Sequence, residues 1–307
     1  MSKFAIVFPG QGSQTVGMLA DLAEQYDVVK QTFAEASEVL GYDLWALVQD
    51  GPAEDLNQTH RTQPALLTSS VAIWRVWQEV GGAQPEVLAG HSLGEYSALV
   101  CAGVIEFKDA VKLVELRGQL MQAAVPAGIG AMSAIIGLDN DAIAKACEEA
   151  AQDQVCSPVN FNSPGQVVIA GNKEAVERAN VLCKEAGAKR AMPLPVSVPS
   201  HCALMQPAAD KLAEALDNIT FSAPALPVIN NADVATETDP AAIKTALVKQ
   251  LHSPVRWTES VERMAAEGIE SLLEFGPGKV LTGLTKRINR SLSGAAVNDT
   301  ASLDAAK

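Results

Sequence analysis

The sequence predicts an α/β fold in which a small domain is inserted into a larger one. Strand-type and helix-type segments alternate along almost the whole chain, which is the pattern of α/β proteins. Residues 131–196 add a β-α-β-β-α-β order, the ferredoxin-like arrangement. The pentapeptide GHSLG at residues 90–94 matches G-x-S-x-G where a strand pattern gives way to a helix pattern, as in α/β hydrolases. We therefore predict an α/β-hydrolase-like large domain, residues 1–125 and 200–307, with a ferredoxin-like insertion, residues 126–199.

The first part of the large domain is predicted from apolar runs and helical spacing. Residues 3–8 and 86–89 are short and apolar, as expected for buried strands. Helices are predicted over 68–80, 95–104 and 109–122. Trp74 and Trp77 lie at helical spacing in the first of these helices, so we expect them in the core.

The inserted segment carries the elements of the small domain in order. Strands are predicted over 131–138, 155–161, 166–171 and 189–196, and helices over 141–151 and 173–186. VPAGIG at 125–130 and the proline-containing stretch 195–199 interrupt these patterns. We expect these two interruptions to be the hinges between the domains.

The large domain resumes after the insertion. A helix is predicted from Leu204, a strand over 226–230, helices near 240–251 and 257–267, and a last strand over 271–275. This strand runs into Gly276-Pro277-Gly278 and a basic helix. The final ~15 residues are small and polar, and we expect this end to be partly loose.

The composition excludes several classes of protein. With 307 residues, 48% hydrophobic and 19% charged, the chain can bury a sizeable core. No apolar run approaches the ~20 residues of a membrane span, and MSKFAIVF is too short for a secretory signal. The net charge of −13 argues against nucleic-acid binding. Five cysteines without a CxxC pair indicate reduced thiols, so we expect a cytoplasmic protein.

The G-x-S-x-G turn makes Ser92 a candidate nucleophile. Glycines on both sides let the chain turn sharply from strand to helix, which exposes the hydroxyl. The next backbone N–H and the positive end of the helix then face the oxygen of any carbonyl that the serine attacks. A chance match in a glycine-containing turn is the alternative, and the flanking strand and helix patterns count against it.

A serine hydroxyl needs a base, and four histidines are available. His201 is the best candidate because it follows a stiff, non-helical stretch and lies downstream of the serine, the expected chain order. His91 is expected to serve the turn itself, and His60 lies in a polar loop. His252 lies at a helix end, where histidine commonly caps.

The group that would orient this base is left open by the residues alone. No aspartate between Ser92 and His201 stands out at a strand end. A backbone carbonyl can also accept the Nδ1–H of an imidazole, so an acidic residue is not required.

A glycine-rich loop, FPGQGSQ at residues 8–14, follows the first strand. A dinucleotide fingerprint fails here because Thr15 stands where it needs glycine, and the region ~20 positions on is helical. We therefore favour a second oxyanion-hole donor from this loop.

Arg117 lies in an apolar helical segment that follows the serine. Such an arginine commonly extends to solvent or pairs with a nearby carboxylate. The functional alternative is a guanidinium fork that grips a substrate carboxylate.

Four separated motifs resemble one family closely, namely FPGQGSQ, GHSLGEYSAL, the arginine on the following helix and the late PSH. It is the acyltransferase family typified by the malonyl-CoA:acyl-carrier-protein transacylases of bacterial fatty-acid synthesis. The resemblance covers nearly the whole chain, the ferredoxin-like insertion included. It implies ping-pong transfer of a malonyl group from malonyl-CoA to the pantetheine thiol of acyl carrier protein through a malonyl-serine ester, without cofactor or metal.

The resemblance also implies roles for the matching residues. Ser92 would carry the acyl group, and His201 would be the general base and then acid. The main-chain carbonyl at Gln250 would orient the histidine. The N–H groups of Gln11 and Leu93 would form the oxyanion hole.

The same resemblance assigns the malonyl carboxylate to a bidentate pair with Arg117. Residues 198–200, before the histidine, do not match the His-Ala-Phe-His of malonyl-specific modular synthases. Specificity for malonyl over methylmalonyl therefore rests on Arg117, on Leu93 and on the resemblance to the stand-alone enzymes.

Both implied substrates are anionic, whereas the protein carries a net charge of −13. We therefore expect a local basic surface from Lys286, Arg287 and Arg290 and from Lys189 and Arg190. An ordinary solvated helix face is the alternative. The chain is expected to be a monomer that binds neither nucleic acid nor a membrane.

Two other functions compete with this interpretation. A serine esterase or thioesterase would use the same site with water as the acceptor, and Arg117 with a carbonyl-oriented histidine counts against it. A nucleotide-binding regulatory protein would use the GQGSQ loop, and the failed glycine spacing counts against it.

Overall fold

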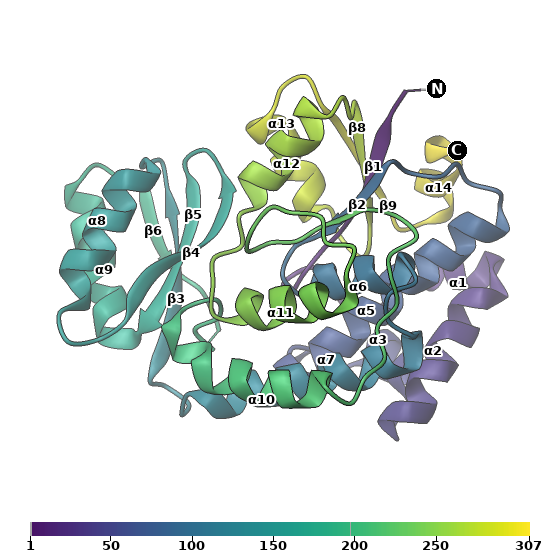
Figure 1. The fold of residues 1–307 in the computed structure, drawn as a ribbon, viewed down its shortest axis with the longest axis horizontal. Helices are drawn as coiled ribbons and strands as arrows, with labels where there is room; N and C mark the ends of the chain where they lie inside the picture. Colours follow the sequence, from purple (N-terminus) through teal and green to yellow (C-terminus); the bar gives the residue numbers. More distant parts are fainter. Residues whose placement is uncertain (1, 197) are drawn as a thin grey trace.

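Two β-sheets organise the chain, which the structure, a computed structural model, describes over residues 2–196 and 198–307 (Figure 1). The first sheet is parallel and contains, in spatial order, β7 (Val228–Ile229), β2 (Val87–Gly90), β1 (Phe4–Phe8), β8 (Ser271–Phe275) and β9 (Ser293–Val297). The second is antiparallel and contains β4 (Cys156–Ser163), β5 (Gln166–Asn172), β3 (Gly130–Ile136) and β6 (Arg190–Pro193). A mixed α/β fold is therefore confirmed.

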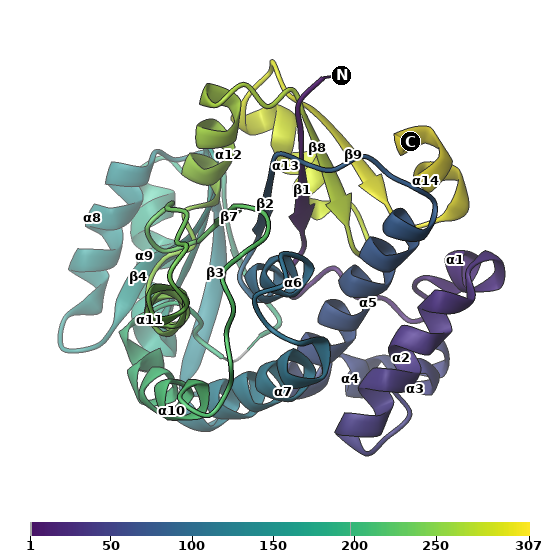
Figure 2. The ribbon, with the colours of Figure 1, turned by 45° about the vertical axis from the view of Figure 1, so that its right-hand side comes forward.

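The parallel sheet is covered on both faces. Along β1, Ile6 and Phe8 join one hydrophobic cluster and Ala5 and Val7 join another, because successive side chains of a strand leave on opposite faces. The larger cluster is completed by helices that include α5 (Thr59–Glu79), α6 (Leu93–Cys101), α7 (Phe107–Ala124), α10 (Gln206–Leu216) and α11 (Pro240–Leu251). The smaller cluster is completed by α12 (Trp257–Ala266) and α13 (Val280–Ile288), across the sheet from α5 and α6 (Figure 2).

Four helices lie between β1 and α5, a segment for which the sequence pattern gave no element bounds and indicated a helix only ~20 positions after the glycine-rich loop. They are α1 (Ala20–Gln25), α2 (Asp27–Leu40), α3 (Leu44–Asp50) and α4 (Ala53–Leu56). Helix α5 also begins well before the predicted residue 68, and it contains Pro64. His60 therefore lies in the first turn of a helix, and its expected place in a loop is wrong.

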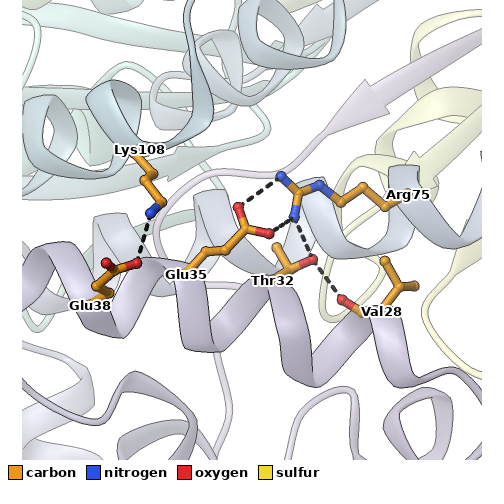
Figure 3. Close-up of polar contacts among 6 residues, drawn as sticks. All are labelled: Val28, Thr32, Glu35, Glu38, Arg75 and Lys108. Carbon is orange, nitrogen blue, oxygen red and sulfur yellow. Dashed lines mark hydrogen bonds and ion pairs between the residues drawn. The ribbon is translucent and has the colours of Figure 1, made fainter.

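Ion pairs join α2 to its neighbours (Figure 3). Arg75 on α5 donates to both carboxylate oxygens of Glu35, at 2.8 and 3.2 Å, and to Thr32 Oγ1 at 3.0 Å. The same guanidinium lies 4.9 Å from the centre of the Phe107 ring at the start of α7. One arginine thus links three helices.

The antiparallel sheet lies within the predicted insertion, residues 126–199, and its elements follow the predicted β-α-β-β-α-β order. Helices α8 (Asn140–Ala151) and α9 (Lys173–Glu185) cover one of its faces and enclose a separate hydrophobic cluster. The other face presents Met132, Ala134, Val159 and Ala170, which pack with Cys202 of the main body. Position 197 of the predicted hinge 195–199 lies outside the described residues.

The C-terminal end forms regular structure, so the prediction that it is partly loose is wrong. The prediction that the strand at 271–275 is the last strand is also wrong. Strand β9 pairs with β8 along its whole length, and α14 (Thr300–Ala306) follows it. Asp299 caps α14, and the N–H of Thr300 donates to Asp21 on α1 at 2.6 Å. The sequence pattern missed β9 because glycine and alanine occupy its centre, and neither favours a strand.

Within the described residues, no helix has the length and apolar character needed to cross a membrane.

Candidate active site

The predicted nucleophile lies at the carboxyl end of the parallel sheet, where ligands of open α/β sheets bind. Ser92 joins β2 to α6 with φ 53° and ψ −110°, a backbone conformation that is strained for a residue with a side chain. The flanking glycines make this turn possible. A Cβ on Gly90 would lie 1.9 Å from the carbonyl carbon of Gly94, and one on Gly94 would lie 2.1 Å from the oxygen of Phe8.

The structure brings the predicted base to this serine. His201 Nε2 lies 2.7 Å from Ser92 Oγ, although 109 positions separate the two residues. The other ring nitrogen, Nδ1, lies 2.7 Å from the main-chain oxygen of Gln250. Gln250 is the last residue but one of α11, where carbonyls lack an intrahelical partner and lie at the negative end of the helix dipole. The helix end thus supplies an acceptor for the imidazole.

His201 is held in its neutral form. Burial, followed by the nearby positive charge of Arg117, lowers the pKa of His201 to about 3, while the hydrogen bond to the Gln250 carbonyl acts in the opposite direction. A neutral imidazole whose Nδ1 carries the proton leaves Nε2 free to accept the proton of the serine.

Arg117 on α7 is buried and directed at the serine. Its Nη2 donates to Ser92 Oγ at 3.2 Å and to Gln250 Oε1 at 3.1 Å, and its Nη1 donates to Gln63 Oε1 at 2.8 Å. Across the described ranges, no carboxylate lies within ion-pair distance of this guanidinium, and its Nε has no hydrogen-bond partner. The side chain neither extends to solvent nor pairs with an acid, so neither of its ordinary explanations holds.

A cavity of about 440 Å³ opens in front of these groups, and both parts of the chain line it. The main body contributes Gln11, His60, Ser92, Leu93, Arg117 and Met121, and the insertion contributes Met132, Asn160 and Leu194. Among the described residues, neither the N–H of Gln11 nor that of Leu93 has a hydrogen-bond acceptor. Both N–H groups are therefore available to a ligand beside the serine.

The other histidines do not meet the serine. His91 Nε2 lies 2.8 Å from Asn162 Oδ1, and its ring packs 5.7 Å from that of Trp257, in keeping with a role in the turn. His60 lines the cavity from the first turn of α5. His252 is the C-terminal cap of α11, as its position predicts.

Several polar side chains behind the nucleophile escaped the sequence patterns. Asn231 Oδ1 accepts the N–H of Ser92 at 2.8 Å, and its Nδ2 donates to Gly90 O at 2.7 Å. Gln63 and the side chain of Gln250 hold Arg117. Asn231 follows β7, the neighbour of β2, so the rule that carboxyl ends of parallel strands meet could have found it. Gln63 gives no such indication.

Comparison with known proteins points to one family. The profile of the acyl transferase domain family matches residues 5–303. The malonyl CoA-acyl carrier protein transacylase of Salmonella typhimurium is 71% identical over 306 residues, covering 100% of this chain and 99% of the relative. The crystal structure of an acyl carrier protein S-malonyltransferase from Vibrio cholerae is 79% identical, with a TM-score of 0.99 and full coverage of both chains. A malonyl-transacylase solved in complex with a type II PKS acyl-carrier protein is 70% identical, with a TM-score of 0.99 and 99% coverage of both chains.

Proposed function

The chain belongs to the acyl transferase family, and we propose that it transfers a malonyl group from malonyl-CoA to the pantetheine thiol of an acyl carrier protein. The single observation that carries the choice of acyl group is Arg117, a buried cation that has no carboxylate within ion-pair distance among the described residues. Such a charge is costly unless an anion pairs with it. A malonyl group carries a carboxylate one methylene away from its thioester carbonyl, which matches a guanidinium 3.2 Å from Ser92 Oγ.

In the first half-reaction, Ser92 Oγ attacks the thioester carbonyl while His201 Nε2 takes the hydroxyl proton. The N–H groups of Gln11 and Leu93 hold the negative oxygen of the tetrahedral intermediate. The C–S bond then breaks, coenzyme A leaves as a thiolate, and His201 returns the proton to it. The malonyl group remains on Ser92 as an ester.

The second half-reaction runs through the same groups in reverse. The pantetheine thiol enters, His201 removes its proton, and the thiolate attacks the ester carbonyl. The C–O bond to Ser92 breaks, His201 returns the proton to Oγ, and malonyl-pantetheine leaves. Because one thioester is consumed and another is made, the overall transfer is reversible. Because coenzyme A leaves before the carrier protein reacts with the malonyl-serine ester, the kinetics should be ping-pong.

A transferase must favour a thiol over water as the acceptor. In the proposed acyl-enzyme, a bidentate pair between Arg117 and the malonyl carboxylate fixes the ester and fills the space beside His201. An esterase would have no use for this buried cation, so the same geometry disfavours hydrolysis as the main activity.

We also propose the finer description of the fold and of its limits. An α/β-hydrolase-like domain would comprise residues 1–125 and 200–307, and the strained serine turn after β2 supports it. A ferredoxin-like domain would comprise residues 126–199, and the spatial strand order β4-β5-β3-β6 supports it.

The proposed carrier protein needs a surface to dock on, and the basic residues at 189–190 and 286–290 are the candidates. Arg287 on α13 donates to Gln166 Oε1 on β5 at 3.1 Å, which links the basic helix to the insertion. Gln166 and Arg190 both pair with Ile136 across the antiparallel sheet, so they lie in one row. A continuous cationic strip across the two parts of the chain would attract an anionic partner despite the overall negative charge.

The chemistry proposed here draws on protein groups alone, so we propose that no cofactor or metal takes part. A monomeric state and a cytoplasmic location complete the proposal.

Mass spectrometry tests the proposed function directly. Incubation of the protein with malonyl-CoA alone should add one malonyl group to the peptide that contains Ser92, and later addition of holo acyl carrier protein should remove it. The Ser92→Ala variant is the control and should stay unmodified. A wild-type protein that releases malonate to water without an adduct, or that never reacts, would contradict the proposal.

A further inference from the structure

Glu95 is a buried carboxyl that the reaction scheme does not use. It lies on the first turn of α6, three residues after the nucleophile, and is only 2% exposed. Burying an acid in this way is unfavourable unless hydrogen bonds compensate. The bonds that it makes point to the active site.

One oxygen of Glu95 joins the two residues that support the nucleophile. Oε2 accepts the side-chain Nε2 of Gln250 at 3.0 Å and the main-chain N–H of Asn231 at 2.9 Å. Gln250 Nε2 also donates to the main-chain oxygen of Ser92 at 2.9 Å. Both partners are fully buried, so water cannot replace the carboxylate as an acceptor.

Each partner holds a different reacting group. Gln250 orients His201 through its carbonyl and Arg117 through its Oε1. Asn231 accepts the N–H of Ser92 and donates to the carbonyl of Gly90, which fixes both sides of the strained turn. A shift of either partner therefore misaligns the nucleophile, the base or the arginine.

We propose that Glu95 is a positioning residue for malonyl transfer, whose carboxylate locks Gln250 and Asn231 into the arrangement that aligns Ser92, His201 and Arg117. The ionised form is the effective one, because a carboxylate accepts both N–H groups more strongly than a neutral acid does. Protonation would loosen the arrangement without removing any group that touches substrate.

The surroundings of Glu95 give this lock a pH dependence. Burial raises the pKa of Glu95 to about 7, and the hydrogen bonds from Asn231 and Gln250 and the charge of Arg117 limit the rise. The negative charge of Asp233 raises the pKa of Glu95 further. The other titratable groups nearby are Tyr96, the next residue in the chain, and Glu237, which lines a small cavity together with Glu95. Burial lowers the pKa of His201 to about 3 and also lowers the pKa of His60 and His91, the other histidines that line the cavity. We therefore assign a fall in activity below about pH 7, the acid limb of the pH profile, to Glu95.

Two variants and two reagents test the proposal, which rests on the proposed function only for its malonyl readout. The rate of Ser92 modification is measured between pH 5 and 9 with malonyl-CoA and, separately, with a neutral fluorophosphonate that needs no malonyl site. Glu95→Ala should slow both reactions about 100-fold, because a displacement of about 1 Å in an active site has effects of this size. Glu95→Gln keeps an acceptor, so it should stay within about tenfold of the wild-type rate at pH 8 and lose the limb near pH 7.

The matched control is Glu274→Gln. Glu274 is likewise buried, and burial likewise raises its pKa, but it lies near the end of β8 and binds the N–H groups of Leu281 and Thr282 at the start of α13. This variant should keep the wild-type rate and the limb. A limb that disappears equally in Glu274→Gln would overturn the assignment to Glu95.

The remaining outcomes are also decisive. Wild-type reactivity in Glu95→Ala would overturn the proposal, and so would an unchanged limb in Glu95→Gln. If Glu95→Ala does not fold, the pH profile of Glu95→Gln decides alone. A wild-type protein that reacts with the fluorophosphonate but forms no malonyl adduct would refute the proposed function, and the role of Glu95 would then be decided by the fluorophosphonate rates of the variants.

Discussion

At the scale of single residues, the site depends on two buried basic groups, Arg117 and His201, which form no ion pair with any described residue. Arg117 is 1% exposed, and its guanidinium binds amides, a hydroxyl and the face of Tyr96 instead of a carboxylate. His201 is buried beside that positive charge and is kept neutral by it and by burial. Both residues are therefore suited to a substrate that carries its own negative charge.

Replacing Arg117 should change which acyl group reacts. Arg117→Ala removes a bidentate, charge-assisted pair, so transfer of malonyl should fall about 100- to 1,000-fold. Transfer of the uncharged acetyl group should rise or hold steady, because the buried charge no longer opposes it. The ratio of kcat/KM for malonyl-CoA to that for acetyl-CoA measures the effect. Arg117→Lys keeps the charge without the fork and should be intermediate, whereas an unchanged ratio in both variants would contradict the role.

Burial of His201 should make stability depend on pH. In the unfolded chain His201 is protonated below about pH 6.5, whereas in the folded chain its pKa is about 3. The stability that is present above pH 6.5 is therefore lost progressively as the pH falls from about 6.5 toward 3. Glu95, with its raised pKa, has the opposite slope between about pH 4.5 and 7, since the folded state holds its proton longer. The two residues partly cancel in the wild type.

A His201→Asn variant should expose this balance. The free energy of unfolding of the variant minus that of the wild type should increase by about 2–3 kcal/mol when the pH falls from 6.5 to 4.5. Urea denaturation of both proteins at these two values measures the difference. A difference that does not vary with pH would mean that His201 titrates normally in the folded protein.

At the scale of elements, helix ends and helix pairs position the site. Helix α7 carries Arg117, α6 begins at Leu93 beside the nucleophile, and the carboxyl end of α11 meets His201. Helix α2 lies outside this group and is joined to α5 and α7 by Arg75 and by Lys108, which donates to Glu38 at 2.7 Å (Figure 3). Because the first contact is less exposed than the second, we expect the two to contribute differently to the free energy of unfolding.

Arg75→Ala should lower the free energy of unfolding by about 1–2 kcal/mol, because its fork is half-buried, binds two groups and stacks on Phe107. Lys108→Ala should have no measurable effect, since its pair with Glu38 is exposed and screened by solvent. Chemical denaturation of the two variants provides the comparison. Equal losses would indicate that burial does not distinguish the two pairs.

Sequence patterns predict these elements unevenly, for physical reasons. Strands β1 and β2 are buried and apolar throughout, and β8 is apolar apart from Ser271 and Glu274, so composition identifies all three. Strand β9 is an edge strand of small residues, and its pairing with β8 comes from tertiary contact that local pattern does not encode. In the site, the motifs identify Ser92, while Gln63 and Asn231 reach it through the folded topology.

At the scale of the whole molecule, the cavity lies where the insertion meets the main body. The insertion lines the cavity with Met132, Asn160 and Leu194. The face of the antiparallel sheet opposite α8 and α9 packs on the segment around Cys202. The basic residues proposed for docking also come from both parts. The proposed substrate cavity and the proposed docking surface are therefore both built from these two parts of the chain.

Charge reversal tests the docking surface. Lys286→Glu together with Arg287→Glu should raise the KM for the carrier protein about tenfold, with a weaker effect at high salt, because exposed charges act mainly on association. Lys30→Glu with Lys112→Glu is the control, since it makes the same change in net charge from exposed positions on α2 and α7. Equal KM values for the two double variants would favour an ordinary solvated helix face.

The main-chain carbonyl that faces His201 also has a genetic consequence. In a triad with an aspartate, a single codon change can delete the third member, but no codon change removes a carbonyl oxygen from the backbone. The histidine of this chain therefore keeps its acceptor under any substitution at Gln250 that leaves the end of α11 in place. Harmful alleles that break this contact should therefore be mainly changes that shift the helix, such as a proline in its last turns. Substitutions at codon 250 should show only the effect of losing the Gln250 side chain.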